Sequence, residues 1–288
     1  MNRSPEHAMV RVKYKGQLGN NLFQYSLGRI IAEETGRKLV ASPIPGFPET
    51  RTEVDGTVGE GSPIICSGQT IDLDHLLRSD LDRPILLEGY FQRYEYYRDH
   101  ASDIQVWLRP GSSPEVAPGP ADVVVHVRVG DVRKPCRPNA YRPVPRWFYE
   151  TVLRRLTWAR LLVVSNDPDD PLTRYVEQEF GGTVVSVSVQ SDFETLRCAR
   201  RIVMSASTFS WWAAWLSDAD EIYLPTTGTW NPSVRWAFAS VRDVDLVVDQ
   251  PRYRYPHSYR LRLEGLYPYY CRLYHALRRR GLLVLRRD

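Results

Sequence analysis

The chain of 288 residues lacks any hydrophobic run that approaches the roughly 18 residues of a membrane-spanning helix. Its N-terminal segment, residues 1–10, lacks the apolar core of a signal peptide, so we expect no export. The 4 cysteines lie far apart and form no Cys-x-x-Cys pair: Cys66, Cys136, Cys198 and Cys271. This usage predicts reduced thiols in a cytoplasmic protein rather than a disulfide framework or a cysteine-ligated metal.

Several well-known catalytic signatures are absent as well. The sequence has no Gly-x-Ser-x-Gly elbow, no His-Glu-x-x-His pair and no Walker loop. Its glycine-containing turn at residues 16–24 does not match the dinucleotide pattern Gly-x-Gly-x-x-Gly. Any chemistry must therefore come from other loops.

The net charge of +4 is unevenly distributed along the chain. From Arg252 onward there are ten arginines against Glu264 and Asp288, a balance of +8. The preceding residues keep 28 basic and 32 acidic side chains, a balance of −4. A nucleic-acid-binding protein would be basic more uniformly, so we expect no nucleic-acid partner.

Short apolar strands alternate with helices, the pattern of mainly parallel, doubly wound sheets. In the first part we expect strands at 10–14 and 84–91 and a helix at 94–107. In the second part we expect strands at 123–129, 161–165, 183–187, 201–204 and 221–224, with helices at 147–156 and 172–180. The predicted fold class is α/β, with two Rossmann-like domains that face each other across a ligand-binding cleft.

The domain boundaries follow from composition. Residues 112–120 are rich in Pro, Gly and Ser and are typical of a linker. We therefore expect an N-terminal domain at 1–111, a C-terminal domain at 121–250 and a basic, aromatic tail at 251–288.

The strand expected at 123–129 ends on polar side chains. His126 and Arg128 share one face, opposite the valines of the other face. They stand at the carboxyl end of the strand, where open α/β sheets hold their ligands. Arg128 offers donors suited to a phosphate. The alternative is a strand-end arginine paired with Asp131.

Three other strand ends are candidate binding loops. In the turn at 16–24, Asn20 or Asn21 is expected to cap a helix, and the turn either approaches a ligand or is a plain tight turn. Residues 205–210 place hydroxyls at a helix N-terminus, a seat for phosphate oxygens, and the tryptophans that follow are expected in the core. Residues 164–170 form either an Asx-rich helix cap or a metal site.

Together these segments resemble one family, the α-1,2-fucosyltransferases of glycosyltransferase family 11. The family pattern Gly-Gly-Leu-Gly-Asn-Gln-x-Phe-Gln-Tyr is similar to residues 16–25, with Gln17 and Asn21 as departures. Its Gly-Tyr-Phe-Gln segment is similar to residues 89–92, and its His-x-Arg-x-Gly-Asp segment to residues 126–131. Its Ser-Asp-Asp turn is similar to residues 165–167, where Asn166 replaces one acid. Its Ser-x-Ser-Thr-Phe-Ser-Trp-Trp-Ala-Ala-Trp-Leu segment is intact at 205–216.

The resemblance implies a GT-B-like enzyme, a galactoside 2-α-L-fucosyltransferase. Such an enzyme transfers L-fucose, with inversion, from GDP-β-L-fucose to the 2-hydroxyl of galactose in a galactose-terminated glycan, in surface polysaccharide or O-antigen synthesis. No metal or other cofactor is expected, and the N-terminal domain would lie on the acceptor side. Arg128 would hold the diphosphate. The other residues implied in nucleotide-sugar binding are Gly19, Asn20, Ser165, Asp167, Ser207, Thr208, Phe209 and Ser210.

The acceptor hydroxyl must lose a proton, and Asp131 and His126 are the candidate bases. Arg128 would keep Asp131 ionised, although Asp131 could equally be a structural partner of that arginine. His126, with an ordinary pKa near ~6.5, could act as the base or be a buried histidine bonded to a carbonyl. Two other functions stay open: fucosyl transfer to another position, and non-catalytic binding of a nucleotide sugar or glycan on the same fold.

In the tail at 251–288, tyrosines are interleaved with arginines. Basic amphipathic segments of this kind can lie on anionic membranes. One interpretation is therefore a cytoplasmic enzyme held at the periphery of the inner membrane, close to lipid-linked acceptors. The other is a solvated arm that packs partly on the C-terminal domain.

Overall fold

The N-terminal unit is built on one parallel sheet, in the order β2-β1-β4-β3. The strands are β1 (Met9–Val12), β2 (Lys38–Val40), β3 (Ile64–Cys66) and β4 (Ile85–Leu87). The helices around them are α1 (Leu18–Thr35), α2 (Leu73–Arg78) and α3 (Ala101–Trp107). The computed structural model describes residues 9–52, 62–78, 83–133, 143–225, 246, 248 and 250–256.

Two local expectations for this unit need correction. Helix α1 begins at Leu18, and its N-cap residue Gln17 makes no side-chain capping bond. Asn20 and Asn21 therefore lie inside the first turn, and the prediction that one of them caps the helix is wrong. The helix expected at 94–107 is broken into the 3₁₀ turns η2 (Tyr94–Tyr96) and η3 (Arg98–His100) before α3 begins.

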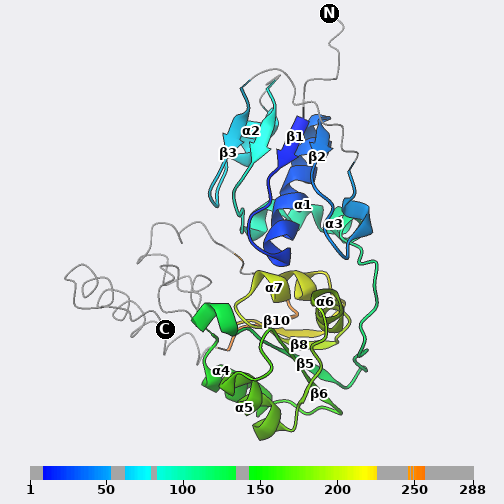
Figure 1. Cartoon of the computed structure of the whole chain (residues 1–288), viewed down its shortest axis with the longest axis vertical. Coiled ribbons are helices and arrows are strands. Elements are labelled where there is room, and N and C mark those ends of the chain that lie inside the picture. Colours follow the sequence, from blue (N-terminus) through cyan, green and yellow to red (C-terminus); the bar gives the residue numbers. More distant parts are fainter. Residues whose placement is uncertain are drawn as a thin grey trace, which may run out of the picture.

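The C-terminal unit holds a parallel sheet in the order β10-β9-β8-β5-β6-β7. Its strands are β5 (Val123–Val127), β6 (Leu161–Ser165), β7 (Thr183–Val184), β8 (Arg201–Val203), β9 (Glu221–Tyr223) and β10 (Tyr253–Arg254). The helices are α4 (Arg146–Leu153), α5 (Pro171–Phe180), α6 (Val189–Arg197) and α7 (Thr208–Trp215). Every residue of β5 is buried, as a central parallel strand requires. The predicted α/β class with two Rossmann-like parallel sheets is confirmed (Figure 1).

The boundary expected at residue 251 is wrong, because the second sheet continues beyond it. Tyr253 and Arg254 form β10, which pairs in parallel with β9. Residues 251–256 therefore belong to the C-terminal unit. The part of the tail proposed to contact a membrane, residues 257–288, lies outside the described residues.

The linker at 112–120 has no helix or strand and runs along the C-terminal unit. The backbone N–H of Glu115 donates to the Ser191 hydroxyl of α6 over 2.9 Å. The linker is thus held against the second sheet's own helices.

The two units meet where α1 and α7 pack together (Figure 1). The Phe23 ring of α1 lies 5.0 Å from Trp211 and 4.8 Å from Trp212 of α7, centroid to centroid. Both tryptophans are fully buried, so the prediction that the tryptophans belong to the core is confirmed. Helix α7 is apolar on nearly all sides because it lies between the two sheets.

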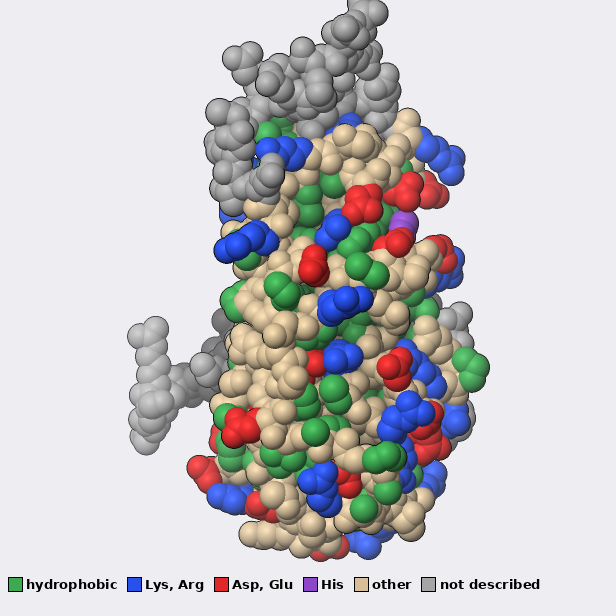
Figure 2. All heavy atoms as spheres, turned by 90° about the vertical axis from the view of Figure 1, so that its right-hand side faces the viewer, with side chains coloured by type: hydrophobic (Ala, Val, Ile, Leu, Met, Phe, Trp, Pro, Cys, Tyr) green, Lys and Arg blue, Asp and Glu red, His purple; other side chains and the backbone are tan. Residues whose placement is uncertain are grey.

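The outer surface carries charges of both signs. On the face shown in Figure 2, basic and acidic side chains of the described residues are interspersed. No helix of the described chain is both long and apolar enough to cross a bilayer.

Candidate active site

The strand order places a switch point between β5 and β8. From β5 the chain builds outward through β6 and β7, and from β8 it builds outward in the opposite direction through β9 and β10. Connections that leave two neighbouring strands in opposite directions open a crevice at their carboxyl ends, where doubly wound sheets bind ligands. The turn that follows β5 and the start of α7, which follows β8, lie at this crevice.

His126 anchors the base of this site. Its side chain is 3% exposed, and its Nδ1 atom lies 2.8 Å from the Ser205 hydroxyl, which follows β8. Its ring lies 5.4 Å from the Phe209 ring of α7. Burial, aided by the nearby charge of Arg128, lowers the pKa of His126 to about 3. The imidazole is therefore neutral at physiological pH and joins β5 to the start of α7.

Arg128 stands one residue beyond the end of β5 and is partly exposed. The turn η4 (Gly130–Arg133) follows it, and Gly130 has the left-handed φ of 63° that the turn requires. The backbone of Asp131 belongs to η4, while its side chain lies outside the described structure. Its pairing with Arg128 and its role as a base stay predictions.

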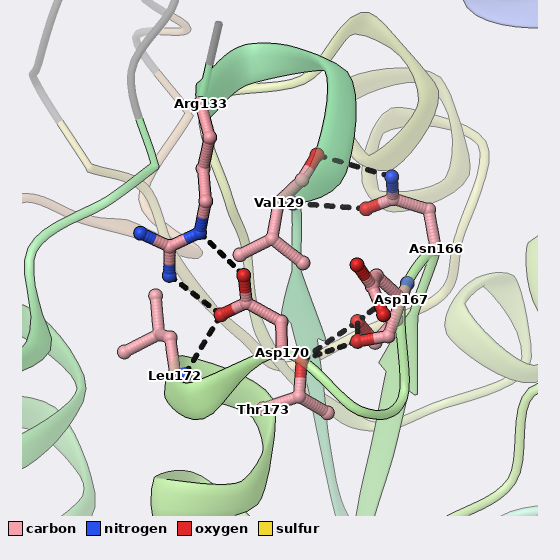
Figure 3. Close-up of polar contacts among 8 residues, drawn as sticks. Val129, Arg133, Asn166, Asp167, Asp170, Leu172 and Thr173 are labelled. Carbon is pink, nitrogen blue, oxygen red and sulfur yellow. Dashed lines mark hydrogen bonds and ion pairs between the residues drawn. The ribbon is translucent and has the colours of Figure 1, made fainter. Parts of the chain in front are cut away.

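The turn after β6 is a helix cap. Asp170 is the N-cap of α5, and its carboxylate accepts the Leu172 N–H over 2.8 Å. The Arg133 guanidinium grips the same carboxylate through two nitrogens (Figure 3). Burial opposes ionisation of Asp170, but the bonds from Arg133 and Leu172 outweigh it and lower its pKa. The helix cap expected within residues 164–170 is therefore observed.

Ser165 and Asp167 lie in the same turn, close to the switch point. The Ser165 hydroxyl lies 2.9 Å from the Thr173 hydroxyl and donates to the backbone carbonyl of Asp167 over 3.1 Å. The Ser165 side chain therefore stabilises the turn. The Asp167 side chain, in the same turn, is half-buried. Within the described part of the chain, no three His, Cys, Asp or Glu side chains are grouped as a metal site would need.

The start of α7 is held by its own hydroxyl groups. Ser207 is the N-cap and accepts the Phe209 N–H over 3.3 Å. Ser210 is fully buried and donates to the carbonyl oxygens of Ser205 and Ser207, at 3.2 Å each. The Ser207 and Ser210 hydroxyls are therefore used within the helix end itself. An anion at this end would interact chiefly with the positive helix dipole and the first N–H groups.

The N-terminal unit contributes the start of α1 to the same place. A Cβ atom added to Gly19 would lie 2.5 Å from the backbone nitrogen of Phe209 and 2.6 Å from the Thr208 hydroxyl. Gly19 is therefore required for the close approach of two helix N-termini. Two positive helix ends therefore meet here, and Arg128 follows β5, the strand next to β8 that leads into α7.

A chain of hydrogen bonds crosses between the units here. The Asn20 side-chain oxygen accepts from the Gln92 amide over 2.8 Å and from the Thr208 hydroxyl over 3.2 Å. Phe91, next to Gln92, is buried with a φ of 51°, a strained conformation for a bulky residue. Gln92 belongs to the segment at 89–92, but the sequence alone indicates no role for it. A glutamine that directly follows the apolar strand expected at 84–91 was the available signal.

All of the predicted binding residues whose side chains are described therefore lie on three strand ends and the start of α1. The structure brings together His126, Ser205 and Phe209 as one contact group, and Asn20 with Thr208 as another. Ser165 and Asp167 lie on the neighbouring turn, which is tied to the turn after β5 by Arg133 and Asp170.

Comparison with known proteins gives two findings. The profile of Glycosyl transferase family 11 matches residues 119–237. No protein of curated function matches the chain in sequence.

Solved structures with a similar course of chain include POFUT1 in complex with GDP-fucose. It is 12% identical with a TM-score of 0.46, and the match covers 75% of this chain and 95% of that one. POFUT1 with GDP is 10% identical, with a TM-score of 0.43 and coverage of 74% and 96%. An arginine-to-lysine variant of Arabidopsis thaliana FUT1 with GDP is 13% identical, with a TM-score of 0.45 and coverage of 75% and 70%.

The family match contains β5 to β9, Arg128 and the start of α7. The motifs at 126–131, 165–167 and 205–216 all lie within it. Residues 119–237 therefore match glycosyl transferase family 11, and the sequence-based resemblance to that family is confirmed over this part of the chain.

Proposed function

We propose that this protein is an inverting fucosyltransferase that moves L-fucose from GDP-β-L-fucose to the 2-hydroxyl of a galactose residue in a glycan. The observation that carries the proposal is that Arg128 and the N-terminus of α7 follow two neighbouring strands, β5 and β8, at the switch point of the sheet that matches family 11. The linkage and the galactose acceptor follow from the motif resemblance.

The leaving group explains why these features matter. When the glycosidic bond breaks, negative charge builds on the β-phosphate of GDP. Preorganised donors in a site that excludes water stabilise such charge, and each donor contributes about 3–4 kcal/mol. In our proposal Arg128 contributes a fixed positive charge and α7 its dipole and first N–H groups. With these present we expect no metal requirement.

Other predicted residues take supporting roles in this proposal. Gly19 and Asn20 face the donor from the N-terminal unit, and Asp167 lies near the nucleotide. Ser165, Ser207, Thr208, Phe209 and Ser210 shape or line the donor site.

The acceptor hydroxyl must transfer its proton to a base. His126 is poorly suited, because it is buried and neutral with a pKa of about 3 and its Nδ1 atom is bound to Ser205. We therefore assign this role to Asp131, and we assign His126 to the positioning of β5 against α7.

The direct test is to incubate the protein with GDP-fucose and a panel of β-galactosides, with and without EDTA, and to assign product linkage by NMR. We expect an α-1,2-linked fucoside formed equally well in EDTA. Formation of no fucoside with any acceptor, or of product only when Mn²⁺ is added, contradicts the proposal.

A binding measurement tests the site itself. Arg128→Ala should weaken GDP binding by about 100-fold, consistent with ~3 kcal/mol for a charged hydrogen bond. Gln178→Glu, on the exposed face of α5, changes charge at a distance from the site and should leave GDP affinity unchanged. Unaltered affinity in Arg128→Ala would remove Arg128 from the site.

A further inference from the structure

Asn166 continues the contact between β5 and β6 beyond the last residues of the strands. The ladder between them ends at Val127 opposite Ser165. Two residues later, the Val129 N–H donates to the Asn166 side-chain oxygen over 2.9 Å. The Asn166 side-chain nitrogen donates to the Val129 carbonyl over 3.1 Å (Figure 3).

These two bonds fix two peptide planes. The N–H of Val129 belongs to the peptide that joins it to Arg128, and its carbonyl belongs to the peptide that joins it to Gly130. Because both planes are held, the φ and ψ angles of Val129, which lie between them, are restricted together. Arg128 is held on both sides, by the β5–β6 ladder at Val127 and by Asn166 at Val129, and this restricts the direction in which its side chain leaves the backbone.

The neighbouring atoms leave little room for another arrangement. A Cβ atom added to Gly130 would lie 3.0 Å from the Asn166 side-chain nitrogen. On the far side of the turn, Arg133 is bound to Asp170. The η4 turn is thus tied at both ends to the turn after β6.

Only an amide can make both bonds at neutral pH. An ionised carboxylate accepts hydrogen bonds but donates none, so it would satisfy the Val129 N–H and repel the Val129 carbonyl. The family motif has an acid at this position. This chain has an asparagine, which can both accept from the Val129 N–H and donate to the Val129 carbonyl.

We propose that Asn166 is a positioning residue that holds Arg128 in the direction needed to bind the donor diphosphate. The proposal rests on the proposed function, since it takes Arg128 to be the diphosphate ligand. Asn166 itself need not touch the nucleotide.

The test compares GDP with GMP, because only GDP offers the β-phosphate that Arg128 is proposed to hold. We expect Asn166→Asp to weaken GDP binding by about tenfold and GMP binding by less than about threefold, the scale of one or two lost hydrogen bonds. Gln178→Glu makes the same amide-to-acid change on an exposed face of α5 and should change neither affinity. A merely structural role would lower the melting temperature and leave the GDP-to-GMP ratio of affinities as in the wild type, which would overturn the proposal.

Lowering the pH should restore GDP binding by Asn166→Asp. A neutral carboxyl group can donate to the Val129 carbonyl and accept from its N–H, as the amide does. From about pH 6 to about pH 4, across the ordinary pKa of an aspartate, the GDP affinity of Asn166→Asp relative to wild type should therefore rise, whereas that of Asn166→Ala should stay low. The charged groups on the adjoining turns are Arg128, Asp131, Arg133, Asp167, Asp169 and Asp170; they are common to all three proteins, so their titration cancels in the ratio. Equal pH dependence in both variants would contradict the proposal.

Arg128→Ala, Asn166→Asp and the variant that combines both distinguish failure of the proposed diphosphate site from failure of the proposed positioning role. If Arg128→Ala leaves GDP affinity unchanged, the proposed diphosphate site is wrong. If Arg128→Ala weakens GDP binding and Asn166→Asp does not, only the positioning role is wrong. When both are correct, Asn166→Asp should have less than about a twofold further effect on GDP binding in the Arg128→Ala background, because coupled residues are not additive.

Discussion

Replacement of Gly19 by alanine tests the contact on which the joining of the two units depends. The added methyl group would meet the backbone nitrogen of Phe209 at 2.5 Å and the Thr208 hydroxyl at 2.6 Å. Backbone at the start of a packed helix cannot rotate aside as a side chain can. Helices α1 and α7 must therefore move apart, and the apolar contact between Phe23 and the tryptophans loosens with them.

Two opposing terms set the size of the effect. Alanine is favoured over glycine within a helix by about 0.5–1 kcal/mol. Overpacking at a buried contact costs about 1–3 kcal/mol. We therefore expect a net loss of about 1–2 kcal/mol, which corresponds to a melting temperature lower by about 2–6 °C for a chain of this size.

Thermal unfolding followed by circular dichroism measures this loss, and GDP affinity should fall in parallel, since in our proposal Gly19 faces the donor. Glu34→Ala, on the exposed side of the same helix, is the matched control and should shift the melting temperature by less than about 1 °C. If Gly19→Ala melts at or above the wild-type temperature, the close approach of α1 to α7 is wrong.

Two further predictions concern pH. Asp170→Asn should destabilise the protein by about 1 kcal/mol at pH 7 through loss of the charge that pairs with Arg133, because asparagine can still cap α5. Because the folded-state pKa of Asp170 is lowered, this contribution is present at neutral pH and is lost as pH falls through that pKa, so urea unfolding should show wild type and variant converge in acid. Asp169→Asn, at an exposed position of the same turn, is the matched control and should change stability little at pH 7. His126 has a pKa lowered from 6.5 to about 3, so its contribution is complete above 6.5 and is lost as pH falls below it. The unfolding free energy of His126→Asn should therefore depend less on pH between 6.5 and 5 than that of the wild type, and identical slopes would show that His126 is not buried as a neutral ring.

The elements that the sequence predicts best are those with a strong local pattern. The strand at 161–165 and the helix that ends at Phe180 are observed where expected, because apolar spacing and a capping aspartate specify them within a few residues. Short edge strands such as β2 and β3 carry too few residues to show a period, so the sequence does not predict either of them. The hydroxyl-rich segment at 205–210 was correctly placed at a helix start, but its hydroxyls serve the helix rather than stand free.

By itself, the sequence determined the alternating α/β pattern, the family-specific segments at the strand ends and the core position of the tryptophans. Tertiary structure alone decided the strand order that creates the switch point. It also decided the bond from Thr208 to Asn20, 188 residues apart, and that from Val129 to Asn166, 37 residues apart. Local patterns record which face of an element is buried, whereas contacts of this kind depend on which elements become neighbours when both sheets pack around α7.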